Sequence, residues 1–194
     1  MIDPEEHLYS DTLSLWTIFC KQNDLDLHTS RISDFINGGM TKLLTFEARH
    51  KSLNFVISQS FIQRDSWLDF IVGAENLSCL FKMPSNRSFY FSLWRKTNWE
   101  RLFNLHKIMS GNPTFDHTFS AKSNMTEFVD KLLRNCKVQD MFLLDELLIF
   151  NIITIDNYMT VSLKSMAKKF YSYDELNMIN QNFKLIIETL ISSI

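Results

Sequence analysis

The sequence predicts an α+β protein, in which antiparallel β-sheet is covered by helices and a long helix forms the C-terminal segment. Two observations support this fold class. Apolar and polar residues alternate along most of 32–93 and again along 150–166, the period expected of half-buried strands. Three capping-box patterns, a Ser, Thr or Asn followed three positions later by Glu, predict helix starts between and after these runs.

The composition is that of a folded chain of ordinary size. Of the 194 residues, 45% are hydrophobic and 22% are charged, and the chain holds 17 Phe but only 4 Gly and 3 Pro. This size and balance predict a single α+β domain over 1–194. The segments 1–110 and 111–194 are candidate halves, because each follows the order helix, strands, helix.

The first predicted elements are an amphipathic helix and four strands. The helix follows Ser10, has Leu8, Leu15 and Phe19 on one face with Trp16 beside them, and ends at Asn23 and Asp24. Alternating apolar residues then predict strands at 44–48, 53–57, 77–81 and 89–93. Turn residues separate them at 37–39, 50–51, 73–76 and 84–86. An antiparallel meander is the simplest arrangement of these strands.

A second helix is predicted to begin at the capping box Thr97–Glu100. Its apolar side includes Trp99 and Leu102, and Gly111 with Pro113 forms a stop signal. The chain is then expected to run extended.

The expected extended segment, 114–122, contains an Asp-His pair between two phenylalanines. In a strand, Phe115, His117 and Phe119 share one face and Asp116 points to the other, so the pair would diverge and not act on one substrate atom. We expect both phenylalanines to be buried, His117 to be at least partly buried, and Asp116 to accept loop amides. The alternative is that Asp116 or His117 belongs to a functional site.

The remaining segment repeats the same types of element. A capping box at Asn124–Glu127 predicts a helix whose apolar residues are Phe128, Val129, Leu132 and Leu133. Asp156-Asn157 separates two alternating runs and predicts a tight hairpin. Ser172–Glu175 starts the long terminal helix, whose apolar stripe consists of Leu176, Ile179, Phe183, Ile186, Leu190 and Ile194.

The pattern Gly-Asn-x-x-Phe-Asp-x-x-Phe, which begins at Gly111 and is followed by Lys-Ser-Asn and a helix, resembles a pattern of uncharacterised bacterial domains of unknown function. The resemblance covers the chain from Gly111 onward. It implies a bacterial source and a fold-defining role for Phe115, Asp116 and Phe119. It implies no catalytic activity.

The sequence contains none of the common catalytic or metal-binding patterns. Its five histidines include no pair four positions apart, and it has no Cys-x-x-Cys, nucleophile elbow, Walker loop or dinucleotide fingerprint. The acidic pair Asp145-Glu146 is interpreted as a solvated transition from helix to strand, with a general-acid role as the alternative. We therefore predict no catalytic residue, no metal site and no cofactor.

A basic and aromatic stretch at 87–101 is the strongest indication of a partner. Strand parity places Phe89 and Phe91 on one face and Tyr90 and Trp94 on the other, so the second face needs its own cover: a helix, a ligand or a protein. The predicted partner or ligand surface consists of Tyr90, Trp94, Arg95 and Lys96. The alternative is a strand that only buries alternate aromatics.

Charge and cysteine usage narrow the class of partner and the compartment. A net charge of −2 argues against nucleic-acid binding. Cys20, Cys79 and Cys136 are far apart, which predicts buried thiols in a reducing, cytoplasmic compartment. No apolar run is long enough for a transmembrane segment, and the acidic N-terminus does not resemble a signal peptide.

These observations predict a non-catalytic domain for protein interaction or scaffolding, which binds another protein or forms a homodimer. The alternative is a small apolar ligand or lipid held in a cavity lined by Phe and Met. A third hypothesis, an enzyme whose site is assembled from distant positions, has less support.

Overall fold

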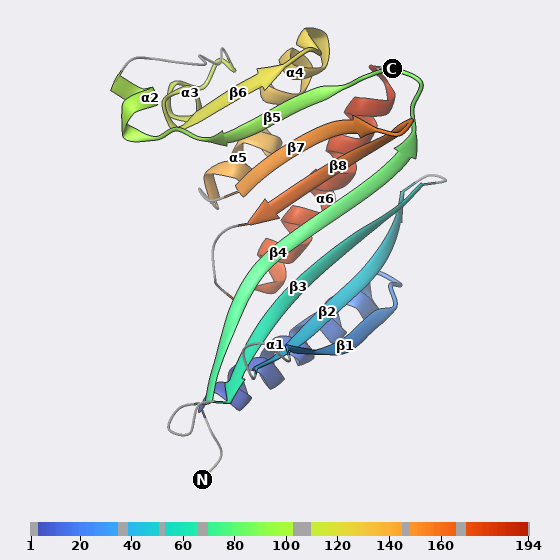
Figure 1. Cartoon of the computed structure of the whole chain (residues 1–194), viewed down its shortest axis with the longest axis vertical. Coiled ribbons are helices and arrows are strands. Elements are labelled where there is room, and N and C mark those ends of the chain that lie inside the picture. The colour runs from blue at the N-terminus through green and yellow to red at the C-terminus, as the bar shows by residue number, and fades with distance from the viewer. Residues whose placement is uncertain are drawn as a thin grey trace. The chain divides into compact units, whose positions relative to one another are not determined.

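The computed structural model describes the backbone of residues 4–34, 39–50, 53–65, 70–102, 110–144, 148–165 and 170–193. It describes the side chains of residues 10–31, 41–50, 53–61, 77–102, 110–144, 148–165 and 170–193. The helices are α1 (Pro4–Gln22), α2 (Asn98–Leu102), α3 (Pro113–Thr118), α4 (Thr126–Leu133), α5 (Cys136–Leu144) and α6 (Tyr173–Ile191) (Figure 1).

The strands form one hydrogen-bonded sheet in the order β1-β2-β3-β4-β8-β7-β5-β6. Their bounds are β1 (Leu27–Asp34), β2 (Gly39–His50), β3 (Leu53–Asp65), β4 (Phe70–Pro84), β5 (Tyr90–Arg95), β6 (Phe119–Ser123), β7 (Leu148–Ile155) and β8 (Tyr158–Ser165). The antiparallel sheet with helices and the long helix α6 confirm the predicted α+β class.

The chain divides into two compact units. Unit 1 comprises Met1–Ser78 and Met166–Met178, and unit 2 comprises Cys79–Ser165 and Ile179–Ile194. Strand β4 and helix α6 each contribute residues to both units. Because these bounds interleave, they do not coincide with the candidate halves on either side of residue 110, and the single-domain organisation stays a prediction.

In unit 1, helix α1 packs against strand β2 through aromatic rings. Trp16 and Phe19 are fully buried, and their ring centroids lie 5.6 and 5.4 Å from that of Phe46. The helix ends as predicted, because the amide and side chain of Asn23 both donate to the Phe19 carbonyl and Asp24 takes a left-handed φ of 55°.

The strands of unit 1 confirm most of the predicted alternation. The buried positions of β2 and β3 are Leu44, Phe46, Ala48, Phe55, Ile57, Gln59 and Phe61.

The turn expected at 73–76 is wrong, since β4 passes through these residues without interruption. Pairing along a 15-residue strand outweighs the local turn preference of Gly73 and Asn76. Residues 37–38 and 51 of two other expected turns lie outside the described residues, while the break near Pro84 is confirmed.

Unit 2 buries the inward face of its strands against helices. The ring of Phe91 on β5 lies 5.8 Å from that of Phe128 on α4, and the ring of Phe150 on β7 lies 6.1 Å from that of Phe142 on α5. The predicted hairpin is confirmed, because the turn between β7 and β8 holds Asp156 and Asn157 at φ angles of 50° and 62°.

Residues 113–118 form helix α3, so the expectation of an extended chain over 114–118 is wrong. The chain is extended only from Phe119, where β6 begins. Asn112 is the N-cap, and its Oδ1 accepts from the amides of Thr114 at 3.1 Å and Phe115 at 3.2 Å. Pro113 occupies the first turn, where its missing amide hydrogen costs nothing. This combination of N-cap and proline decides the conformation.

Two of the three predicted capping boxes are confirmed. Glu100 accepts from the Thr97 amide at 2.8 Å, and Glu175 accepts from the Ser172 amide at the same distance. The third is wrong. Asn124 instead accepts from the amide of Tyr90 at 2.8 Å, and α4 begins after Met125 without a side-chain cap.

The prediction that Trp99 and Leu102 form the buried, apolar side of the second helix is also wrong. Trp99 and Leu102 of α2 are 70% and 72% exposed. The remainder of that predicted helix, 103–109, lies outside the described residues.

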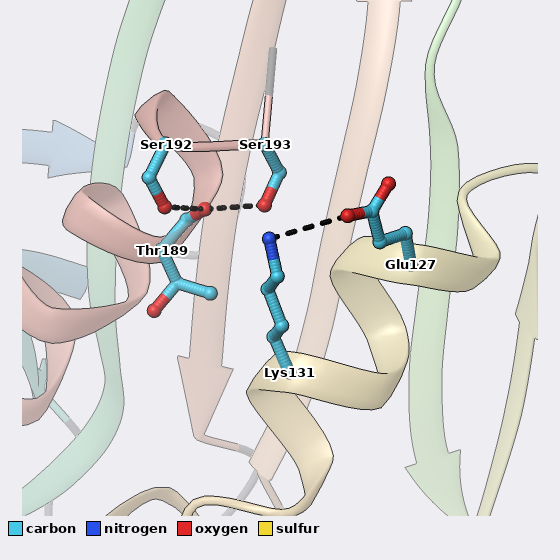
Figure 2. A network of polar contacts seen from close by, with 5 residues as sticks. All are labelled: Glu127, Lys131, Thr189, Ser192 and Ser193. Atoms are coloured by element: carbon cyan, nitrogen blue, oxygen red, sulfur yellow. Dashed lines mark hydrogen bonds and ion pairs between the residues drawn. The ribbon is translucent and has the colours of Figure 1, made fainter.

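The C-terminal turn of α6 carries its own polar contacts beside α4. The Thr189 carbonyl accepts from the hydroxyls of Ser192 at 2.9 Å and Ser193 at 2.7 Å. On α4, the Lys131 ammonium lies 3.4 Å from the Glu127 carboxylate, and Figure 2 shows Lys131 extending toward Ser193. A cation at this place complements the negative end of α6, whose own last turn has no basic residue.

A buried amide in α6 leads to a stability prediction. Asn180 is fully buried, and neither polar atom of its side chain has a hydrogen-bond partner in the described part of the chain. Because an unpaired buried amide is costly, Asn180→Leu is expected to raise the free energy of unfolding by about 1–3 kcal/mol. Urea denaturation measures the change, and Asn177→Leu on the same helix controls for helix propensity. A loss of stability in Asn180→Leu would contradict the prediction.

Candidate functional site

The candidate site is the outward face of the sheet in unit 2. Figure 1 shows α5 and the C-terminal part of α6 on one side of β7 and β8, and no helix of the described residues over the other side. Strand register assigns the side chains to this second side, which we call the open face. Its residues on β5 to β8 are Tyr90, Ser92, Trp94, Ser120, Lys122, Ile149, Asn151, Ile153, Ile155, Tyr158, Thr160, Ser162 and Lys164.

One end of the open face is an exposed apolar cluster. The open-face patch consists of Tyr90, Ile153, Ile155 and Tyr158, which are 40%, 41%, 58% and 56% exposed. Tyr90 is the direct register partner of Ile153, and Ile155 is that of Tyr158. The two isoleucines are two positions apart on β7 and therefore point to the same side. The four side chains form one contiguous surface.

A row of polar side chains lies beside the patch. Ser92 on β5 is the register partner of Asn151 on β7, and its hydroxyl donates to the Asn151 Oδ1 at 2.7 Å. Asn151 is in turn the partner of Ser162 on β8, and Ser92 that of Lys122 on β6. This polar row separates the patch from the residues at the other end of the strands.

The structure disperses the four residues of the predicted partner surface. Tyr90 belongs to the open-face patch. Trp94 is half-buried, and its Nε1 donates to a Glu100 carboxylate oxygen on α2 at 3.0 Å, so a helix supplies part of its cover. Arg95 is half-buried at the end of β5.

Lys96, the fourth of these residues, is buried and connects the end of β5 to α3. Its amide donates to the Thr118 carbonyl at 2.8 Å, and its Nζ donates to the Asp116 carbonyl at 2.6 Å. Its side chain is only 5% exposed, so most of it is inaccessible to a partner.

The Phe-Asp-x-x-Phe stretch packs into the core of unit 2. Phe115 and Phe119 are fully buried, as predicted, with ring centroids 4.8 Å apart. Asp116 Oδ1 accepts from the Ser110 amide at 3.0 Å, which confirms the expected bond to the preceding loop. The expectation for His117 is wrong, because helix α3 turns this side chain into solvent. The fold-defining role of the stretch stays a prediction.

A groove lies in unit 1 along α1. This solvent-open groove has a volume of about 560 Å³ and is lined by Asp11, Ser14, Leu15, Ile18, Gln22 and Tyr173. The α1 residues recur at helical spacing and form one stripe of that helix. Ile18 is 52% exposed and supplies much of the apolar character. The lining includes no Phe or Met.

The cysteines fall into two environments. Cys20 and Cys79 are buried as predicted, whereas Cys136 is exposed, which corrects the expectation of three buried thiols. Burial raises the pKa of the Cys20 thiol from its ordinary 9.0 to about 11, and the nearby Asp26 carboxylate adds to the rise. Burial also raises the pKa of the Cys79 thiol.

The described residues include neither a metal-type cluster nor a membrane-spanning helix. No group of three or more His, Cys, Asp or Glu side chains in this part of the chain is arranged to hold a metal ion. No helix described here is both long and apolar enough to cross a membrane.

Comparison with known proteins gives no relative: no family model, curated protein or solved structure matches this chain. The bacterial source and the resemblance of the Phe-Asp-x-x-Phe stretch therefore stay predictions.

Sequence reasoning located one residue of the patch and missed the other three. The signal was present in the stretch Ile152 to Ile155, where three of four residues are isoleucine. A half-buried strand alternates apolar with polar residues, so apolar residues on both faces indicate that the second face is also covered or binds something.

Proposed function

We propose that this protein is a non-catalytic interaction module that binds another protein through the open-face patch. The observation that carries the proposal is the exposure of four large apolar side chains, adjacent in register, at the end of the open face away from Trp94 and its cover by α2. Contiguous exposed apolar surface is a common mark of interaction sites. Burying a fully exposed side chain of this size is worth roughly 1.5–3 kcal/mol, and burial of the exposed part of each patch side chain contributes about half of that.

The charge of the open face favours a different protein over a second copy of this chain. Exposed lysines lie at Lys122 and Lys164, and Lys82 is exposed on β4, the neighbour of β8 in the sheet. Face-to-face association of two copies with the lysine-bearing ends superposed would bring these like charges together, which is unfavourable. A heterologous complex avoids this repulsion.

A small apolar ligand is the second candidate function, because the α1 groove is large enough for one. Its stripe of Leu15, Ile18 and Tyr173 offers apolar contact, with Asp11 and Gln22 as polar groups. Native mass spectrometry of the purified chain tests this function directly, since a retained ligand adds a defined mass.

Site-specific photocrosslinking tests the interaction module. We expect that p-benzoylphenylalanine in place of Tyr158 gives a discrete crosslinked protein band when irradiated in the cells that make this protein. The same replacement at Lys137, an exposed position on α5, is the matched control and should give no such band. Adding Ile155→Ser should weaken the Tyr158 band because it removes apolar contact area.

Two results would contradict the proposal. If the chain with p-benzoylphenylalanine at position 158 gives no crosslinked band that is absent from the control at position 137, no protein docks on the patch. A band of twice the chain's mass, containing only this protein, would replace the heterologous complex by a homodimer.

A further inference from the structure

We infer that the partner segment docked on the open face is acidic, with Asp or Glu side chains next to apolar ones. This inference rests on the proposed function and names the chemistry of its partner. The charged residues among the open-face positions on β5 to β8 are Lys122 and Lys164, and no carboxylate occupies any of these positions. The described outward positions of β4 add Lys82 and also have no carboxylate.

The three lysines are available to a partner. Lys82, Lys122 and Lys164 are exposed, and none of them forms an ion pair with another residue of the described chain. This contrasts with Lys131 on α4, which pairs with Glu127. The chain as a whole has a net charge of −2, so the positive charge of the open face is local.

Register places Lys122 and Lys164 on one side of the patch. Lys122 flanks the polar row, and Lys164 is the partner of Ile149, one row further from the patch. Successive outward residues on a strand are about 7 Å apart and neighbouring strands about 4.8 Å apart, so an extended segment of four to six residues would span from patch to lysines. Such a segment can place apolar side chains on the patch and carboxylates on the ammonium groups.

The hairpin turn at the opposite end of the patch carries one carboxylate. Asp156 lies in the hairpin turn directly after Ile155 and is exposed. A partner carboxylate would be repelled there and attracted toward the row of Lys164. The apolar residues of the partner are therefore expected to contact β7 near the turn, and its acidic residues to lie toward Ile149.

Single-stranded nucleic acid, another anion, fits the open face less well. Stacking platforms for bases consist of aromatic rings, whereas the centre of the patch is Ile153 and Ile155. The Trp94 ring, the largest on this face, is held by the carboxylate of Glu100, which would repel a phosphate. The net negative charge of the chain also opposes a polyanion.

Selection of peptides tests the inference. A random 12-residue display library is selected on the full-length wild-type chain and depleted on an Ile155→Ser/Tyr158→Ser variant, whose exposed substitutions leave the core intact. We expect the enriched peptides to carry net negative charge together with at least two aliphatic or aromatic residues. Peptides that are enriched but neutral or basic would overturn the acidic partner while leaving the interaction module standing. Failure to enrich any patch-dependent peptide would count against both.

Binding constants of one enriched peptide then test the role of the lysines. Lys122→Gln and Lys164→Gln are each expected to weaken binding roughly two- to fivefold, the size of an exposed ion pair, and more strongly at 50 mM than at 300 mM salt. Lys137→Gln on α5 is the control and should leave the affinity unchanged. Equal affinity in all three variants would overturn the inference.

A (dT)12 oligonucleotide is the last arm of the experiment. If it binds the wild type more tightly than the enriched peptide does, and the patch variant loses that binding, the occupant is nucleic acid and the acidic-peptide inference is wrong.

Discussion

Phe115→Ala is expected to lower the free energy of unfolding by about 3–5 kcal/mol, the range for removing a buried aromatic ring and leaving a cavity. The Phe115 ring is fully buried, and its centroid lies 4.8 Å from that of Phe119 and 6.3 Å from that of Phe142. The truncation removes contacts from a cluster of rings that joins α3, β6 and α5. The midpoint of urea denaturation measures the loss.

Two further variants make the Phe115 result specific. Phe115→Leu keeps much of the volume and is expected to cost less than Phe115→Ala. Thr114→Ala changes the exposed neighbour on the same helix and is expected to shift the free energy by no more than about 0.5 kcal/mol. A midpoint of Phe115→Ala equal to that of the wild type would contradict the packing assigned to this ring.

Deletion of residues 175–194 is expected to cause aggregation. It removes nearly all of α6, whose buried residues in unit 2 are Ile179, Asn180, Asn182, Phe183, Ile186, Ile187 and Leu190. Without the helix, the apolar residues that it covers would face water, and association of that surface is favourable. Size-exclusion chromatography combined with near-UV circular dichroism measures the outcome.

A short deletion separates the helix from the residues that follow it. Removal of 192–194 takes away two serine hydroxyls that bond to Thr189 but leaves the buried stripe intact, so this variant should elute like the wild type. If the long deletion also elutes without aggregates, with an unchanged near-UV spectrum, α6 is a detachable arm and not a cover of the core.

The sequence predicted best those features that depend on neighbouring residues. Alternation identified Phe46, Phe55 and Phe91 as buried strand residues because successive side chains of a strand point to opposite faces. It failed for 113–118, because a six-residue helix is too short to show a helical period. There the Asn-Pro start signal outweighs the alternating phenylalanines.

Features that depend on distant residues could not be read from local patterns. Asn124 has the sequence context of a capping box, but its side chain bonds to Tyr90 on another element. The open-face patch likewise depends on distant residues. Strand parity predicted an uncovered Tyr90, but the position of Tyr90 beside Ile153 results from the pairing of β5 with β7. Such register is set by packing and long-range pairing.

The division of unit 1 along the chain has a consequence for protein synthesis. Its two parts are separated by residues 79–165, which a ribosome adds at about 5–20 residues per second. In the finished fold the ring of Phe170 lies 6.0 Å from that of Phe61, and the ring of Tyr173 lies 5.5 Å from that of Phe19. For several seconds after their synthesis, strands β2 and β3 would therefore be exposed without the second part of unit 1. Nascent chains would expose an incomplete sheet during this interval, which makes β2 and β3 the expected binding sites for a ribosome-associated chaperone.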